Sequence, residues 1–425
     1  MEKQQCDASA AVNGTPVIFR KGKDRLSFNL PVREFARIGI ASIVALCGIG
    51  AFAVGQAGAA GDKIKVGLVL QLTGPFSDSG RQMINGIKTY VSQYGDTVAG
   101  KKIELVIKDV GGSAPEIAKR HCQELVVKDK VDFIAGFGLT PDALACAPIA
   151  TEAKKPTIDM MAATSIITAK SPYIVRTSLT LPQVSEPMAQ WAYKNGYREV
   201  YTLVADYGPG HDAGNAFQKA FVKLGGKLVG EVRVPLKNPE FGPYVQRVKD
   251  SKPQALFVFF PTGELPVAFM KSFKERGLAN AGIKLIATGD VLDDGQMDAM
   301  GDATLGVIST YHYSVAHQSP ENKAFLAAYK KIDPITRPNG HAIGAYDGMA
   351  AIYAVAKQLN GNIDGDKAMA VLKGLKLNSP RGPVLIDPET RDIVQNVYVR
   401  EAKKINGKVY NVEFDTFNAV KDPWK

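Results

Sequence analysis

From residue 63 onward, short apolar runs alternate with stretches in which apolar residues recur at helical spacing. The first runs have the length and composition of strands: KIKVGLVL, KKIELVIKDV, VDFIAGF and KPTIDMM. Between the first two runs, one helix face is indicated by Met83, Ile84, Ile87, Tyr90 and Val91. Strand–helix–strand order with short connections is typical of a parallel sheet covered by helices on both faces, so the sequence predicts an α/β fold.

A second alternating series follows an extended, proline-bounded stretch at residues 171–182. Its predicted strands lie in REVYTLVADYGPG, GGKLVGEVRVPL, PQALFVFFPTG and IKLIATGD. The rest of the chain, two helical patterns and a strand pair, is too small to form a lobe alone. We therefore predict two doubly wound parallel-sheet lobes: residues 61–180 with about 311–392, and residues 181–310 with about 393–425. Several crossings between the lobes would form a hinge, with a binding cleft between them.

Residues 1–60 have the features of an export segment. The stretch Ile38–Val54 carries no charge, follows two arginines, and precedes an A-x-A-type cleavage site at Ala57-Gly58-Ala59. We predict a cleavable signal peptide and a periplasmic mature protein. One alternative is an uncleaved membrane anchor, for which 17 apolar residues is at the short limit. Another is lipidation at Cys47, although Leu46 stands where a small residue is expected.

The charge of the chain does not favour a nucleic-acid partner. The net charge is +10, and residues 61–425 hold 45 Lys and Arg against 38 Asp and Glu, or +7. These charges are interspersed and form no dense basic run. We therefore expect no binding of nucleic acid.

Motifs for catalysis and metal binding are incomplete. Residues 95–101 match G-x-x-x-x-G-K, but Lys102 follows in place of Ser or Thr, and the motif lies between a helix and the next strand. Gly136-Phe137-Gly138 begins like a dinucleotide fingerprint, but Pro141 stands where its third glycine belongs. H-E-x-x-H, C-x-x-C and G-x-S-x-G do not occur, and the five histidines are scattered. We expect no enzyme activity, no metal and no cofactor.

Two cysteines, Cys122 and Cys146, lie in the predicted mature protein, each on a predicted helix. An oxidising compartment permits a disulfide between them, which would add roughly 3 kcal/mol in the chain-entropy model. The alternative is a pair of buried free thiols.

Four loops that follow predicted strands are rich in glycine, alanine and hydroxyl residues: residues 73–80, 138–141, 162–165 and 206–210. Glycine and alanine let a ligand approach the backbone, and serine and threonine hydroxyls both donate and accept hydrogen bonds. Such a set suits a carboxylate held by N–H groups and hydroxyls. For each loop alone, ordinary helix capping is the alternative.

The order of these segments resembles a known family. TGPFSDSG, GFGLTPDALACAPIA, AATSIITAKSPYIVRTS, LVADYGPG and HAIGAYDGMAAIYAVAKQL follow one another as in the periplasmic leucine/isoleucine/valine-type binding proteins of ABC importers. The likeness covers nearly all of residues 63–400. It implies a type I periplasmic-binding-protein fold, in which two α/β lobes joined by three crossovers close around a ligand. It also implies an inner-membrane ABC permease as partner, and we expect a monomer.

The resemblance implies roles for the first-lobe loops. Thr140 falls where a hydroxyl meets the ligand carboxylate. Ala162 and Thr164 fall where a backbone group and a threonine complete that contact, and Ala163 lies between them. Ser79 occupies a position where the family often has an aromatic residue. Arg81 would be a cation at the cleft mouth that pairs with an acidic ligand, or else a solvated residue of the helix start.

The second lobe supplies further candidates by the same resemblance. Tyr207 matches a cleft aromatic, and Thr262 lines the opposite side of the cleft. Asp290 lies near the acidic residue that binds an α-ammonium group, which favours a branched-chain or related amino acid delivered to an ABC importer. The altered first loop, with Ser79 and Arg81, keeps an aromatic carboxylate or amide as the alternative ligand. A ligand-sensing component of a receptor system is the other alternative.

Overall fold

The computed structural model describes residues 63–425. The predicted signal peptide, its cleavage site and Cys47 lie outside the described residues. In the part described, no helix combines the length and apolar character that crossing a membrane requires.

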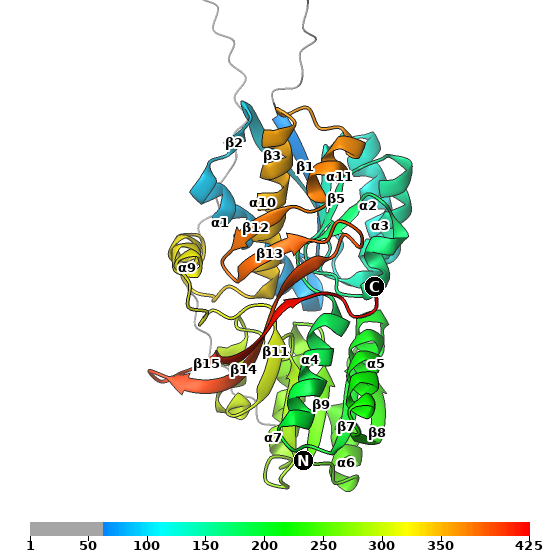
Figure 1. Ribbon diagram of the computed structural model, residues 1–425, viewed down its shortest axis with the longest axis vertical. Coiled ribbons are helices and arrows are strands. Elements are labelled where there is room, and N and C mark those ends of the chain that lie inside the picture. Colours follow the sequence, from blue (N-terminus) through cyan, green and yellow to red (C-terminus); the bar gives the residue numbers. More distant parts are fainter. Residues whose placement is uncertain (1–62) are drawn as a thin grey trace, which may run out of the picture. The chain divides into compact units, whose positions relative to one another are not determined.

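The first lobe is built on a six-stranded sheet in the order β2-β3-β1-β4-β5-β6, parallel except for β2 (Figure 1). Its strands are β1 (Lys63–Leu70), β2 (Thr97–Val98), β3 (Lys101–Asp109), β4 (Phe133–Gly136), β5 (Thr157–Asp159) and β6 (Ile174–Arg176). Its helices are α1 (Ser77–Tyr94), α2 (Pro115–Val127), α3 (Thr140–Glu152), α9 (Pro320–Ile332), α10 (Gly340–Gln358) and α11 (Gly365–Leu372), with 3-10 turns at Gly74–Phe76 and Ser165–Lys170.

The second lobe is built on a nine-stranded sheet, in which β8-β7-β9-β10-β11 are parallel. These strands are β7 (Glu199–Ala205), β8 (Lys227–Val234), β9 (Ala255–Phe259), β10 (Lys284–Thr288) and β11 (Ile308–Tyr311). The antiparallel strands β14 (Ile393–Ile405) and β15 (Lys408–Val420) extend it, and β13 (Gly382–Ile386) and β12 (Lys376–Ser379) continue the pairing from β14 beside α10 of the first lobe (Figure 1). The helices are α4 (Leu181–Lys194), α5 (Gly208–Lys223), α6 (Phe241–Asp250), α7 (Glu264–Glu275) and α8 (Met297–Met300), with a 3-10 turn at Gly301–Thr304.

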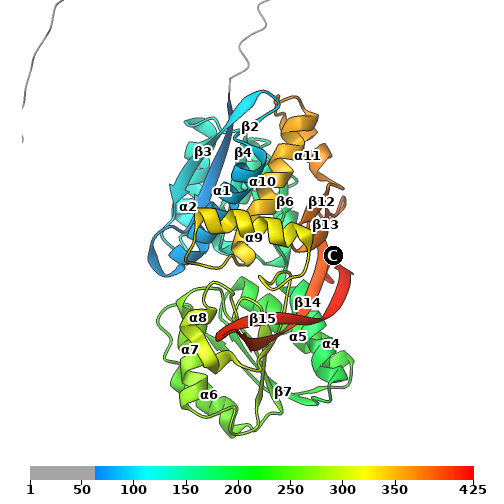
Figure 2. The ribbon, with the colours of Figure 1, turned by 90° about the vertical axis from the view of Figure 1, so that its left-hand side faces the viewer.

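The chain passes between the lobes after β6, after β11 and along β14 (Figures 1 and 2). The predicted α/β class, with two doubly wound lobes and a three-strand hinge, is confirmed. The sequence prediction placed no helix over α4, where Pro182 and Pro187 interrupt the pattern. Pro182 is tolerated in the first turn, which Thr180 and Gln183 close with a capping box.

Cys122 on α2 and Cys146 on α3 are joined by a disulfide in the structure, with their Cα atoms 5.9 Å apart. Both side chains are buried among the apolar residues between α2, α3 and the first sheet. The bond therefore ties α2 to the helix that begins at Thr140.

Helix α10 packs along α1 in the first lobe (Figures 1 and 2). Tyr90 of α1 contacts the rings of Tyr346 and Tyr353 edge-on, with both centroids 5.0 Å away. At Gly86 the two backbones come so close that an added Cβ would lie 2.1 Å from the carbonyl oxygen of Ala342. Only glycine at position 86 permits this approach, which also fixes the first turn of α10.

Replacing Gly86 with alanine should therefore push α1 and α10 apart and lower the free energy of unfolding by about 1–3 kcal/mol. Gly112→Ala is the matched control, because its Cβ would have no atom within 4 Å. Urea denaturation of the two variants measures the difference, and equal midpoints would contradict the packing described.

Candidate ligand-binding site

A small cavity lies where the two lobes meet. First-lobe residues in its wall are Gln71, Phe76, Ser79, Gly138, Leu139, Thr140, Met161, Ala163 and His341. Leu181, at the first crossing between the lobes, and Tyr207, Pro209, Phe259, Pro261, Thr262 and Asp290 complete it. The free space inside this wall is about 20 Å³, which is room for about one water molecule, so a larger ligand enters only if the wall moves apart.

The position of the cavity follows from the sheet topology. In the first sheet the strand order reverses at β1, which pairs with β3 on one side and β4 on the other. In the second sheet β7 has the same place, between β8 and β9. The loops on the two sides of such a reversal lead to opposite faces of the sheet. A crevice therefore forms between them at the carboxyl ends of the strands. The cavity lies between residues that follow these strand ends within one or two positions: Gln71, Gly138, Tyr207 and Phe260.

Much of the cavity wall is apolar and aromatic. The rings of Tyr207 and Phe259 stack with their centroids 6.2 Å apart and their planes 16° from parallel. Phe76, from the first lobe, and Leu181 and Met161 add to the same wall. Flat apolar surfaces of this kind bury a planar ring well.

Several helices begin at the cavity. Thr140 is the first residue of α3, Pro209 is in the first turn of α5, and His341 is in the first turn of α10. A helix amino terminus carries partial positive charge and N–H groups without partners in the helix. Among the described residues that line the cavity there is no lysine or arginine. The helix starts and hydroxyls are therefore the groups available to hold an anion.

Thr140 and Thr164 form a hydroxyl pair at this anion-binding end. Their Oγ1 atoms are 3.0 Å apart, and the backbone N–H of Thr164 donates to Thr140 Oγ1 at 3.4 Å. The second lobe closes on this pair through Gly208, where an added Cβ would lie 3.1 Å from Thr164 Oγ1. Glycine thus lets the start of α5 approach the threonines of the other lobe.

Asp290 supplies the one carboxylate among the described residues of the cavity wall. Its Oδ1 accepts a hydrogen bond from the hydroxyl of Tyr311 at 3.1 Å, while its Oδ2 has no partner among the described residues. Burial raises the pKa of Asp290 to about 6, so it is mostly ionised at neutral pH. Thr262 lies beside it and donates to the Asp290 carbonyl oxygen at 3.3 Å.

Two polar residues of the wall, His341 and Gln71, were missed by the sequence analysis. In the sequence, His341 is one of five scattered histidines without the spacing of metal ligands, and nothing else marks it. Burial lowers its pKa to about 3, so its imidazole is neutral. Gln71 lies between the predicted strand, which ends at Leu70, and the predicted loop, which begins at Thr73, and it was assigned to neither. Its Nε2 donates to Asp142 at 2.7 Å, and its Oε1 accepts nothing from the described part of the chain.

Three predicted site residues do not line the cavity. Arg81 lies on the outer surface of α1, where its guanidinium pairs with Asp78 three residues earlier and its side chain is 56% exposed. This placement corresponds to the solvated alternative, since helical geometry turns position 81 away from Ser79. Ala162 is buried with both backbone groups in use, and Thr164 stands behind Thr140. Ser79, Thr140, Ala163, Tyr207, Thr262 and Asp290 do line the cavity.

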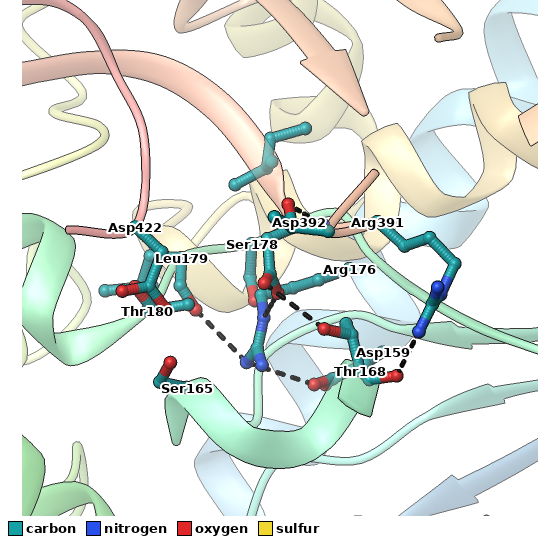
Figure 3. Close-up of polar contacts among 12 residues, drawn as sticks. Asp159, Ser165, Thr168, Arg176, Ser178, Leu179, Thr180, Arg391, Asp392 and Asp422 are labelled. Atoms are coloured by element: carbon teal, nitrogen blue, oxygen red, sulfur yellow. Dashed lines mark hydrogen bonds and ion pairs between the residues drawn. The ribbon is translucent and has the colours of Figure 1, made fainter. Parts of the chain in front are cut away.

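Behind the cavity, the guanidinium of Arg176 holds the loop at residues 161–164 (Figure 3). It donates to the carbonyl oxygens of Ala162 and, at 2.8 Å, of Thr164. Asp159 binds the same loop from the other side, since its Oδ1 accepts from the N–H of Ala162 at 2.8 Å. Ala163, between these anchored residues, is thereby fixed in the cavity wall.

Arg176 is itself held between two carboxylates (Figure 3). It lies 2.9 Å from Asp392 and 3.2 Å from Asp159, and all three side chains are buried. Asp392 stands immediately before β14, the third crossing between the lobes. Lys425, after β15, binds both Asp392 and the hydroxyl of Thr168. One ionic cluster therefore connects the ligand loop to the hinge.

A family model described as periplasmic binding protein matches residues 63–408. The two-lobed fold and the interlobe cavity are those of a solute-binding protein, and the chain belongs to this periplasmic binding protein family. No group of His, Cys, Asp or Glu in the described residues is arranged to hold a metal ion.

Individual relatives cover nearly the whole described chain. A Leu/Ile/Val-binding protein homolog 6 from Brucella melitensis is 43% identical over 382 residues, which is 89% of this chain and 98% of that one. A solved ABC-transporter solute-binding protein from Rhodopseudomonas palustris BisB5, in complex with 3,4-dihydroxybenzoic acid, is 53% identical with a TM-score of 0.83. It covers 86% of this chain and 99% of its own. A second solved solute-binding protein, from R. palustris HaA2 in complex with p-hydroxybenzoic acid, is 46% identical with a TM-score of 0.83. The match covers 85% of this chain and 99% of that protein. The predicted leucine/isoleucine/valine-type resemblance is confirmed.

We predict that Arg176→Lys weakens both folding and ligand binding. An ammonium cannot reproduce the fork of N–H groups that joins two carboxylates and two carbonyls, so several buried groups lose partners. The melting temperature should fall by several degrees and ligand affinity by about tenfold or more. Arg233→Lys, at an exposed position of β8, is the control and should change neither. Calorimetry gives the melting temperatures of the two variants, and titration gives their ligand affinities. Equal affinities of the two variants would contradict this role of Arg176.

Proposed function

We propose that the protein binds an aromatic carboxylate of the benzoate class in the periplasm and delivers it to the permease of an ABC importer. The observation that carries this proposal is the composition of the cavity. Stacked aromatic rings form its wall, and helix amino termini with hydroxyls supply its anion-binding groups. A benzoate is a flat ring with one carboxylate, so each of its parts has a matching surface.

The ligand would be held without a full counter-charge. The Thr140 hydroxyl and the N–H groups at the start of α3 would take the carboxylate, and the start of α5 would approach it from the second lobe. Buried hydrogen bonds to a charged group contribute more than those between neutral groups. A neutral anion site also lets the carboxylate leave when the lobes separate, which a carrier requires.

Closure would depend on contacts that both lobes make with one ligand. Tyr207 and Asp290 lie in the second lobe, and Thr140 and Ala163 in the first. A ligand that contacts all of them favours the closed arrangement by its differential affinity for it. This carrier acts as a monomer, reaches the periplasm through its amino-terminal export segment, and performs no chemistry on its cargo. Family membership and the solute-binding relatives support the carrier role and the extracytoplasmic location.

A branched-chain amino acid is the second candidate. Asp290 Oδ2, buried and without a partner, is a suitable acceptor for an α-ammonium group. The relative from Brucella melitensis, named as a Leu/Ile/Val-binding protein homolog, supports this candidate. The higher identity to the protein bound to 3,4-dihydroxybenzoic acid, and the aromatic cavity wall, favour the benzoate class.

Thermal denaturation of the mature protein with different ligands tests the proposal. At about 100 times its dissociation constant, a true ligand adds roughly 2.7 kcal/mol to the free energy of unfolding. We expect benzoate or 4-hydroxybenzoate to raise the melting temperature by several degrees and leucine to have little effect. A shift with leucine but with neither aromatic acid would contradict the proposal and favour the amino-acid candidate.

A further inference from the structure

Two buried polar groups of the cavity wall face the ligand space without protein partners. Asp290 is 4% exposed and its Oδ2 accepts no hydrogen bond from any described residue. His341 is also 4% exposed, and its Nδ1 has no hydrogen-bond partner among the described residues. A buried polar group that lacks a partner destabilises the protein, so such a group in a binding cavity points to a ligand atom that completes it.

Tyr311 brings these two groups to one end of the cavity. Its hydroxyl donates to Asp290 Oδ1 at 3.1 Å, and Arg400 lies over its ring 5.0 Å from the centroid. Gly340, the residue before His341, packs on the same hydroxyl: an added Cβ there would lie 2.5 Å from Tyr311 Oη. Asn339 caps α10 by accepting from the N–H of His341 at 3.0 Å, which fixes the start of that helix. The start of α10 in the first lobe therefore packs on the same tyrosine that binds Asp290 in the second lobe, and both Asp290 and His341 line the cavity.

We propose that Asp290 and His341 together recognise a hydroxyl on the ring of the ligand, so that the protein selects hydroxybenzoates over benzoate. This inference rests on the proposed function, since it assumes a benzoate-class ligand. The ring hydroxyl donates its proton to Asp290 Oδ2 and accepts a hydrogen bond from an imidazole N–H of His341. A hydroxyl has one donor and can accept, so this pair of partners satisfies it fully.

The chemistry of the pair favours a hydroxyl over its common alternatives. A bare ring edge would leave Asp290 Oδ2 buried and unsatisfied, and sites built to bind a hydroxyl discriminate strongly against ligands that lack it. An ammonium group has only donors, so it would pair with Asp290 Oδ2 and the unprotonated imidazole nitrogen, whereas a hydroxyl uses Oδ2 and the imidazole N–H. The carboxylate end of the ligand then lies at Thr140 and the helix starts, which supply donors.

Isothermal titration of four acids against the mature protein tests this specificity: benzoate, 4-hydroxybenzoate, 3,4-dihydroxybenzoate and 4-fluorobenzoate. We expect at least one of the two hydroxylated acids to bind tenfold or more tightly than benzoate. The fluoro acid, similar in size to the 4-hydroxy acid but without a donor, should bind within about threefold of benzoate. Equal binding of benzoate and both hydroxylated acids would overturn the inference while leaving the proposed function intact. If no aromatic acid binds, the proposed function fails and this inference with it.

Variants assign the discrimination to the two residues. Asp290→Asn and His341→Phe should each lower the ratio of hydroxylated-acid affinity to benzoate affinity by at least fivefold. A cooperative thermal transition without ligand shows that each variant is folded, and His341→Gln replaces His341→Phe if that variant does not fold. Asp302→Asn, an exposed aspartate of the second lobe, is the charge-matched control and should keep the full preference. An unchanged preference in the Asp290 and His341 variants would overturn the assignment.

Discussion

The buried ion pairs of Arg176 hold in place the loop that forms part of the ligand site. Taking a guanidinium and two carboxylates out of water costs several kcal/mol for each ion, and only close geometry with further hydrogen bonds offsets that cost. Here Asp159 and Asp392 flank the guanidinium at 3.2 and 2.9 Å, and the carbonyl oxygens of Ala162 and Thr164 in the loop accept hydrogen bonds from it. Because every partner is buried, the cluster admits few alternative arrangements. The loop is therefore rigid before any ligand arrives.

The same cluster links recognition to lobe movement. Asp392 precedes β14, and Lys425 reaches it from the residues after β15, so both lie where the chain passes between the lobes. On the other side of the loop, the N–H of Ser165 donates to Asp212 of α5, in the second lobe, at 2.9 Å. A change in the angle between the lobes must therefore alter contacts at both ends of the ligand loop. This arrangement supplies the differential contacts by which a ligand favours one state over another.

Much of the fold could be predicted from the sequence, because its signals are local. Strands such as 133–136 and 255–259 are continuous apolar runs, as expected for parallel strands buried on both faces. The loop containing Thr140 was recognisable for a related reason: it follows a strand and begins a helix, the arrangement that binds anions. The antiparallel strand β15 was not predicted, because its exposed residues give no clear alternation and its pairing with β14 is a tertiary contact.

The site could be predicted only in part. His341 and Gln71 reach the cavity because distant elements place them there, and no spacing in the sequence marks either residue. Ala162 and Thr164 belong to the correct loop, but hydrogen bonds with Asp159, Arg176 and Thr140 occupy their polar groups. Arg81 follows a residue of the cavity by two positions, and on a helix that places it on another face. Position in a loop was predictable from the sequence, whereas the direction of each side chain required the packed structure.

A crystal structure of the mature protein with 4-hydroxybenzoate tests the central claim most directly. The account predicts that the ligand lies between the lobes with its ring against Tyr207 and Phe259. Its carboxylate should lie within hydrogen-bond distance of Thr140 Oγ1, and its hydroxyl within that distance of Asp290 Oδ2 and of an imidazole nitrogen of His341. A ligand bound in the reverse orientation, or outside this cavity, would contradict the account.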